Sequence, residues 1–368
     1  MSSISTGRHD HLRLATFNLF NFIEPPNAYY EFENIYTKEQ WLKKLDWISK
    51  YLYEHQPDVI GFQEVFSTDA LKQLCQQCGL VHFAVLDTPD VADDFIYSKP
   101  VVALASRFPI LDACSVAADR KMIAMMGLDE DFDFSRKPLR ATIEVPKIGA
   151  TDCYVVHFKS KRPLFEPNEL SKQEADQLSV SPQKVRPHSY NASIGHQLAV
   201  EALGQWGSSI QRGSEAALLR YAMVERRILS QNPMILMGDF NDSLSDGVLA
   251  ALTAVDTRVK PDYGLTAGSK GANELFGQYR LQDAYELYQS SQYALSAQAR
   301  VATHYYFAKG SVLDYILLSN EFDPKSNQNL AEVGRYEVYD RHLINPSFEH
   351  DSQSTDHAPV MITLSMRE

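Results

Sequence analysis

One ten-residue stretch constrains this chain more than any other, the sequence PMILMGDFND from Pro233 to Asp242. A short apolar run leads into Gly238 and is followed by Asp239, an aromatic residue, Asn241 and a second carboxylate. Apolar runs of this length are typical of a buried strand. The polar residues would then lie at the end of that strand, where a rigid element can hold catalytic groups in place.

Polar side chains end several other apolar runs. The run that starts at His11 ends in Asn18, the run from Pro57 ends in Gln63-Glu64, and the run from Thr151 ends in His157. A lone carboxylate after a buried run needs a partner, because burying an unpaired charge is costly. A bound metal ion is one such partner for Glu64.

The last two clusters pair an acid with an imidazole. Asp314 is predicted to lie inside an apolar strand at 312–318, and Asp356-His357 precedes the last strand, which ends near Leu364. An Asp among apolar residues is expensive unless it is paired, and a histidine is a natural partner. Three cations follow His157 within five residues, and Lys159 and Lys161 among them are predicted to face a phosphate.

Helices and further strands fill the chain between these clusters. A capping box at Thr37 to Gln40 predicts a helix through Leu52, and Ser67 begins a second helix that runs to about Cys78. Further strands are predicted at 81–86, 101–105, 139–145 and 152–156, and the alternation in 139–145 favours an antiparallel sheet. A long insertion at 162–232 is polar at first and helical from about 190 to 229, and three glycines leave open its division into two helices (Gly204, Gly207, Gly213).

Composition narrows the function classes. The chain has 368 residues and a formal net charge of −12, which argues against binding nucleic acid by general charge attraction but suits a cation site. Cys75 and Cys78 form a Cys-x-x-Cys without the second pair that a zinc site needs. Neither a P-loop nor a dinucleotide-binding glycine motif is present.

Targeting signals are also missing from the sequence. The first ten residues contain no apolar signal region, and no apolar run reaches the ~18 residues of a membrane span. We therefore expect a cytoplasmic protein without stable membrane insertion, unless a leader was removed. Because the polar clusters spread over the whole chain, we expect residues 1–368 to form one domain around one site.

Five motifs in order resemble the motif series of the endonuclease/exonuclease/phosphatase superfamily: Phe17-Asn18, Gln63-Glu64, Gly238-Asp239-Phe240-Asn241, Leu313-Asp314-Tyr315 and Ser354-Thr355-Asp356-His357. That superfamily includes DNase I-like and exonuclease III-like nucleases, inositol polyphosphate phosphatases and neutral sphingomyelinases. The resemblance implies an α/β (α+β) four-layer sandwich of DNase I-like type, with two packed mixed β-sheets flanked by helices. It also implies a phosphoesterase that uses a divalent metal, Mg²⁺ in the first place and Mn²⁺ or Ca²⁺ as alternatives.

The resemblance also implies a role for each matching residue. Asn18 and Glu64 would hold the metal, with Asp356 near it. Asp239 would orient or deprotonate the attacking water, and Asn241 would support the pentavalent centre. Asp314 would pair with His357, which contacts the scissile phosphate or handles a proton, and His157 matches a second histidine of the DNase I-like and sphingomyelinase-like branches.

Two positions depart from the exonuclease III-like pattern. Phe20 stands where those enzymes carry an acidic residue, and Ser311-Val312 stands where they carry Trp-Arg, so a pocket for an abasic site is disfavoured. The aromatic residues from Phe20 to Tyr36 either form a stacking surface beside the site or pack a loop onto the core.

Three functions remain in order of preference. The first is a metal-dependent nuclease or phosphodiesterase acting on a phosphoester substrate such as nucleic acid or a nucleotide. The second is a phosphomonoesterase or lipid-headgroup phosphodiesterase, inositol phosphatase-like or sphingomyelinase-like, because a fold does not fix its substrate. A non-catalytic binding module comes last, because every polar catalytic position is filled.

Overall fold

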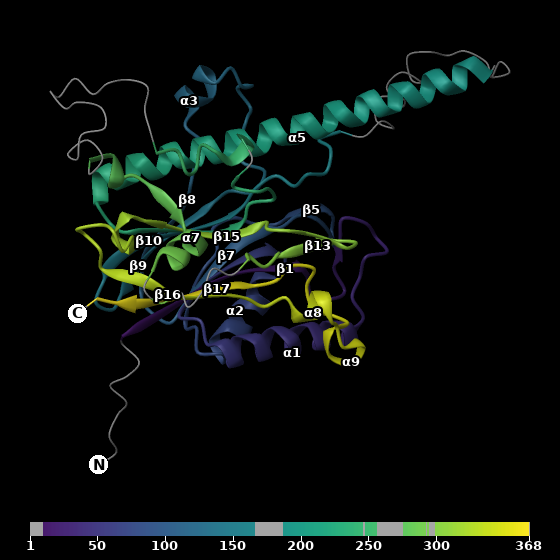
Figure 1. Cartoon of the computed structure of the whole chain (residues 1–368). Coiled ribbons are helices and arrows are strands. Elements are labelled where there is room, and N and C mark those ends of the chain that lie inside the picture. The colour runs from purple at the N-terminus through teal and green to yellow at the C-terminus, as the bar shows by residue number, and fades with distance from the viewer. Residues whose placement is uncertain are drawn as a thin grey trace.

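A computed structural model describes residues 10–165, 187–245, 247–255, 275–291, 293 and 299–367, with side chains from residue 194 onward in the helix that begins at 187. Two six-stranded sheets form the centre of the molecule (Figure 1). In spatial order, the first sheet consists of β16 (Ala331–Val338), β17 (Val360–Met366), β1 (His11–Phe22), β3 (Val59–Val65), β7 (Val101–Ser106) and β4 (His82–Ala84). The second consists of β12 (Leu281–Asp283), β15 (Asp314–Ser319), β11 (Met234–Asp239), β10 (Gly149–His157), β9 (Leu139–Val145) and β8 (Ile110–Ser115).

Both sheets are mixed. β1 pairs in parallel with β3, and β10 pairs in parallel with β11, whereas the other neighbouring strands of the two sheets pair antiparallel. The ends of two parallel strands lie at the same edge of a sheet. Each parallel pair therefore brings two strand exits together.

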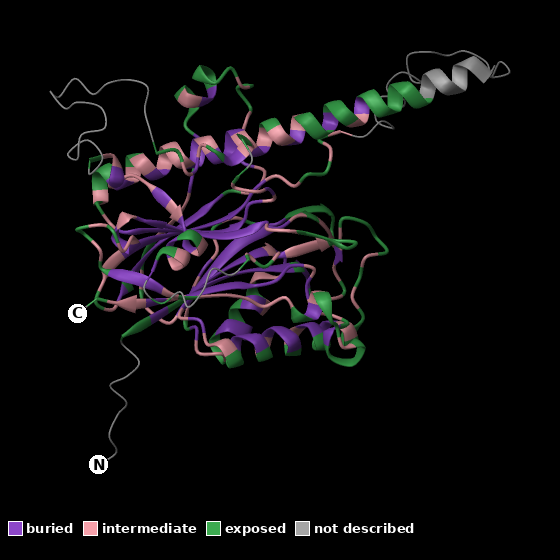
Figure 2. Ribbon diagram, in the orientation of Figure 1, coloured by how far each residue is buried: buried purple, intermediate pink, exposed green. Residues whose placement is uncertain are grey.

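The main core lies between the two sheets. Leu14, Val59 and Leu104 of the first sheet belong to one buried cluster with Val155 and Met237 of the second. Figure 2 shows this interior as a continuous buried layer. The prediction of two packed mixed sheets is confirmed.

Helices cover both outer faces and complete four layers. The first sheet is covered by α1 (Lys38–His55) and α2 (Thr68–Gln77), whose apolar residues share a core cluster with Phe17 and Phe62. The second is covered by α5 (Pro187–Ser230), which packs Leu219 and Met223 into a cluster with Tyr154. Short helices occupy connections: α3 (Arg120–Met125), α7 (Ala284–Ser290), α8 (Arg341–Ile344) and α9 (Phe348–Asp351).

The predicted capping box at the start of α1 is confirmed. Gln40 N donates to Thr37 Oγ1 at 3.2 Å, and Thr37 N donates to Gln40 Oε1 at 2.8 Å. These bonds satisfy two backbone donors that the helix itself cannot. The helix places Lys44, a residue that the sequence reading did not single out, in the protein interior with 1% of its surface exposed.

The division of the insertion helix into two is wrong for the described residues. α5 runs unbroken for 44 residues, and its C-terminal part covers the outer face of the second sheet while its earlier turns project beyond the sheet (Figure 1). Two of its glycines allow a close approach of the preceding loop: a Cβ on Gly204 would lie 2.9 Å from Pro163 Cβ, and one on Gly207 would lie 3.3 Å from Leu164. That packing offsets the low helix propensity of glycine. The polar first part of the insertion lies largely outside the described residues.

Two more sequence predictions differ from the structure. Asp314 is the first residue of β15 instead of lying inside it. Several short strands were not predicted, because they are too short or too exposed to give an apolar pattern: β2 (Ala28–Tyr29), β5 (Asp90–Asp93), β6 (Ile96–Lys99), β13 (His304–Tyr306) and β14 (Lys309–Ser311). No helix among the described residues is long and apolar enough to cross a bilayer.

Candidate active site

The pairing of strands within each sheet brings the first site residues opposite one another. In the second sheet, His157 on β10 lies opposite Asp239 on β11, and Asp239 lies opposite Asp314 on β15. In the first sheet, Asn18 on β1 lies opposite Gln63 on β3, and Glu64 follows with a left-handed backbone (φ 59°). Non-glycine residues rarely adopt this conformation, and such strain is concentrated at functional sites.

The packing of the two sheets joins these two groups. Asn18 Nδ2 donates to Glu64 Oε1 at 3.3 Å within the first sheet and to Asp239 Oδ2 at 3.1 Å in the second. Thr355 Oγ1 donates to Asn18 O at 2.7 Å, which fixes the segment containing Asp356 beside the end of β1. Side chains more than 300 positions apart in sequence thus surround one point.

Asp239 occupies that point. Its Oδ1 accepts the backbone N–H of Asn241 at 2.8 Å, and Asn241 Nδ2 donates to its Oδ2 at 3.3 Å. The same Oδ2 lies 3.6 Å from His157 Nε2 and 3.9 Å from His357 Nε2. Burial raises the pKa of Asp239 to about 7, so the carboxylate can accept a proton near neutral pH.

His357 is held by an acid on its far side. Its Nδ1 lies 2.8 Å from Asp314 Oδ2, and both side chains are buried. Burial alone would lower the pKa of His357, but the carboxylates of Asp314 and Asp239 outweigh it and raise that pKa well above its usual value. The imidazole is therefore charged, and its Nε2–H faces the site as a cationic donor.

The pKa of His157 is shifted in the opposite direction from that of His357. Burial, with the nearby charges of Arg136 and His357, holds its pKa well below the usual range. Its imidazole is neutral, and its Nδ1 is buried without a hydrogen-bond partner among the described residues. Two histidines on either side of Asp239 thus differ in charge.

The remaining acids suit a divalent cation. Glu64 accepts Asn21 N at 2.9 Å in addition to the Asn18 bond, and Asp356 Oδ1 is buried with no hydrogen-bond partner among the described residues. Two groups of carboxylate and imidazole atoms lie within 4.8 Å of one another, Asp239 with Asp314 and His357, and His304 with Asp356 and His357. Carboxylate oxygens are ligands that hard cations prefer, and the Asp356 oxygen without a hydrogen-bond partner among the described residues is free to be one.

This arrangement agrees with a sequence comparison. The profile of the Endonuclease/Exonuclease/phosphatase family matches residues 15–357. The chain belongs to the endonuclease/exonuclease/phosphatase family. It is therefore a phosphoesterase, a hydrolase of a family that is typically metal-dependent, and the prediction of the family is confirmed.

Two solved structures with TM-scores above 0.5 have a similar fold at low sequence identity. An endonuclease/exonuclease/phosphatase from Bacteroides vulgatus is 14% identical, with a TM-score of 0.51 and coverage of 97% of this chain and 99% of that one. ANGEL2, a 2′,3′-cyclic phosphatase, is 13% identical, with a TM-score of 0.52 and coverage of 96% and 95%. An AP endonuclease from Archaeoglobus fulgidus is 13% identical, with a TM-score of 0.46 and coverage of 95% and 98%. No curated protein sequence matches the chain significantly.

The structure pairs the two lysines predicted to face a phosphate with oxygen atoms of the protein itself. Lys159 Nζ donates to Arg162 O at 2.9 Å and to Ser160 O at 3.4 Å, and Lys161 Nζ lies 2.7 Å from Asp242 Oδ1. Arg212 of α5 holds the other oxygen of Asp242 at 2.6 Å. Both lysines thus contact protein oxygens, and their phosphate-binding role stays a prediction.

Three site residues were missed by the sequence reading. Arg136 Nη1 donates to Phe158 O at 3.3 Å, beside His157, and is a candidate phosphate ligand. His304 on β13 forms a backbone bridge with His357, with ring centroids 5.0 Å apart. Lys44 Nζ donates to Ser354 O at 3.1 Å under the segment that carries Asp356. Each stands in a segment without a strand-exit pattern, so no local signal identified it.

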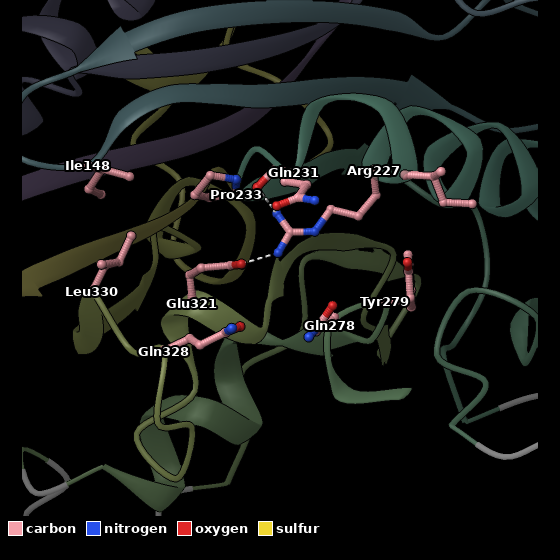
Figure 3. Close-up of a pocket in the computed structure, with 10 residues that line it drawn as sticks. Ile148, Arg227, Gln231, Pro233, Gln278, Tyr279, Glu321, Gln328 and Leu330 are labelled. Carbon is pink, nitrogen blue, oxygen red and sulfur yellow. Dashed lines mark hydrogen bonds and ion pairs between the residues drawn. The ribbon is translucent and has the colours of Figure 1, made fainter. Parts of the chain in front are cut away.

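A separate cavity of about 420 Å³ lies at the other ends of the same strands (Figure 3). Pro233, which precedes β11, lines it together with Arg227 and Glu321. Arg227 donates to the carbonyl oxygens of Gln231 and Asn232 and pairs with Glu321. Its charge is therefore already compensated within the protein, and the Asp239 cluster remains the candidate active site.

Proposed function

We propose that this protein is a divalent-metal-dependent phosphodiester hydrolase, and in the first place a nuclease. One observation carries the proposal. A single carboxylate oxygen, Asp239 Oδ2, lies 3.1 Å from Asn18 Nδ2, 3.6 Å from His157 Nε2 and 3.9 Å from His357 Nε2. In-line attack on a phosphodiester needs a base for the attacking water and donors for the phosphoryl oxygens, and this cluster contains both.

Asp239 serves as the base in this proposal. It accepts the proton of the attacking water, and Asn241 orients it through the bonds to both of its oxygens. His357, charged and held by Asp314, donates from Nε2 to a phosphoryl oxygen as negative charge develops. His157 supplies a second, uncharged contact from the opposite side.

Asn18, Glu64 and Asp356 would hold the cation, which we propose to be Mg²⁺. A cation there supplies neutralisation of the phosphate and of the leaving oxygen. The residues fit it, because Glu64 is a half-buried acid and Asp356 has an oxygen without a hydrogen-bond donor among the described residues.

Substrate choice separates this proposal from its alternative, a phosphomonoesterase or a lipid-headgroup phosphodiesterase. Hydrolysis of bis-p-nitrophenyl phosphate is compared with that of p-nitrophenyl phosphate, with Mg²⁺, Mn²⁺, Ca²⁺ or EDTA. Plasmid nicking is compared with release of inorganic phosphate from inositol phosphates. We expect the diester and the plasmid to be cleaved, and EDTA to abolish both activities. Preference for the monoester or the inositol phosphates would favour the alternative.

Two substitutions test the assigned roles. We expect Asp239→Asn and His357→Ala to lower turnover by about a thousandfold or more, since the first removes the base and the second removes a charged donor to the phosphoryl oxygen. Circular dichroism should show an intact fold in both variants. Asp131→Asn and His350→Ala are matched controls, because both residues are exposed, and we expect wild-type rates for them. A wild-type rate in Asp239→Asn, with any of the metals, would refute its role.

A further inference from the structure

A cavity of about 430 Å³ opens beside Asp356. Four parts of the chain line it: Phe20 near the end of β1, the segment 29–36, the first turns of α1, and the turn at 352–356. Such a volume suits a group of the size of one nucleoside. Asp356 and Phe20 stand at the end of the cavity nearest the candidate metal ligands, because Phe20 N donates to Asn18 Oδ1 at 3.0 Å.

Three aromatic residues, Phe20, Tyr29 and Tyr36, are among those that line the cavity. Phe20 is 38% exposed and has a left-handed backbone (φ 50°), so its ring is held outside the core. The rings of Tyr29 and Tyr36 lie 5.7 Å apart, and Tyr36 Oη donates to Phe20 O at 3.3 Å. These contacts fix the rings before any ligand arrives, which reduces the entropy lost on binding.

The buried ammonium group of Lys44 lies close to two of these rings. Lys44 Nζ lies 5.7 Å from the centroid of the Phe20 ring and 5.5 Å from that of the Tyr36 ring, and it donates to Ser354 O at 3.1 Å. A cation under a ring face is attracted by the ring quadrupole. Lys44 thus ties the aromatic wall to the turn that carries Asp356.

The charges around the cavity exclude several ligand classes. Among the described residues that line it, Lys44 is the one cation, and Glu33 and Asp356 are two carboxylates. A second phosphate, as in an inositol polyphosphate, would find no surplus of positive charge. An acyl chain would meet the carboxylates and the amides of Asn34 and Gln353.

We propose that this cavity binds the nucleobase next to the scissile phosphate. An uncharged planar ring can stack on the side chains of Phe20, Tyr29 and Tyr36, and amide side chains at the rim match the donors and acceptors of a base edge. The inference rests on the proposed function and narrows it. Among the phosphodiesters that the proposed function allows, it selects nucleotide esters as the substrate class.

Binding tests the proposal independently of catalysis. In Asp239→Asn protein with Mg²⁺, calorimetry compares thymidine 5′-phosphate and thymidine 3′-phosphate with 2-deoxyribose 5-phosphate and inositol 1-phosphate. We expect at least one thymidine phosphate to bind about tenfold or more tightly than the two ligands without a base. Tyr29→Leu or Phe20→Leu, added to Asp239→Asn, reduces that preference to within about threefold, because each keeps an apolar side chain but removes a ring face.

Phe32→Leu is the matched control, since Phe32 lies in the same loop, is 61% exposed and does not line the cavity. We expect it to keep the preference. Equal binding of all four phosphates, or a preference that survives both Tyr29→Leu and Phe20→Leu, would overturn the proposal.

Measuring hydrolysis tests the base site and the proposed phosphodiesterase activity separately. The p-nitrophenyl esters of thymidine 5′-phosphate and 3′-phosphate are compared with methyl p-nitrophenyl phosphate in the wild-type protein. Faster cleavage of a thymidine ester supports both proposals. Equal cleavage of all three, with equal binding of the phosphates, leaves a phosphodiesterase without a base site. Base-dependent binding without cleavage of any ester keeps the base site and removes the proposed hydrolysis.

Discussion

At the scale of single residues, Asp239 is a group whose burial lowers stability while its position serves the proposed chemistry. Its carboxylate is buried, and burial raises its pKa from 3.8 to about 7. A shift of this size corresponds to a cost of roughly 4 kcal/mol for the ionised form in the metal-free protein. Active sites often retain such unfavourable groups because the chemistry requires them.

The sign of the pH dependence follows from that shift. Because the folded state binds the proton of Asp239 more tightly than the unfolded chain, stability is lost as the pH rises from about 4 to about 7. Asp239→Asn removes this titration. We therefore expect the metal-free variant to melt several degrees above the wild type at pH 8, with the difference vanishing near pH 4. Thermal melts in EDTA check this, and a variant no more stable than the wild type at pH 8 would contradict it.

Residue types at strand ends could be predicted from the sequence, but contacts between distant segments could not. Asn18 and Asp239 lie at strand exits that the pattern of apolar runs indicates, and their types suggest chemistry. The 3.1 Å bond between them depends on how two sheets pack. Arg136 reaches the site from a loop, and Lys44 reaches it from a buried face of a helix. Neither residue follows an apolar run, so no sequence pattern marks it as part of the site.

At the scale of elements, β11 behaves as its sequence predicts, because an apolar run of five residues is long enough to mark a buried strand. Gly238 within it has φ 151°, and a Cβ there would lie 2.0 Å from Val156 O of the neighbouring strand. The glycine thus permits the close approach of β10 that sets His157 opposite Asp239. The exact start of β15 and the short exposed strands could not be read, since strand ends depend on tertiary pairing.

Gly238→Ala should therefore damage both the fold and the site. We expect a loss of about 3 kcal/mol or more in the free energy of unfolding, from overpacking and backbone strain. Any folded fraction should lose activity because Asp239 is displaced. Urea denaturation measures the first effect. Gly247→Ala is the control, because a Cβ there meets no atom within 4 Å, and comparable stability of the two variants would contradict this account of Gly238.

At the scale of the whole molecule, the packing of the four layers brings strand ends that are distant in sequence to one place. The order of motifs along the chain predicts the sandwich and the family, both of which are confirmed. The expectation that residues 1–368 form a single domain stays a prediction. The length and continuity of α5 could not be predicted, because its glycines gain their packing partners only in the folded protein.

Cation binding at the meeting point of the two sheets is the central claim, and it can be measured directly. Mn²⁺ is titrated into metal-free wild-type protein and into Glu64→Gln by calorimetry, and its position is found by anomalous diffraction from crystals of the wild type. We predict an ion in contact with Glu64, beside Asn18 and Asp356, and an affinity at least about tenfold weaker in Glu64→Gln because a charged ligand is lost. An ion bound elsewhere, or an unchanged affinity in Glu64→Gln, would contradict the account.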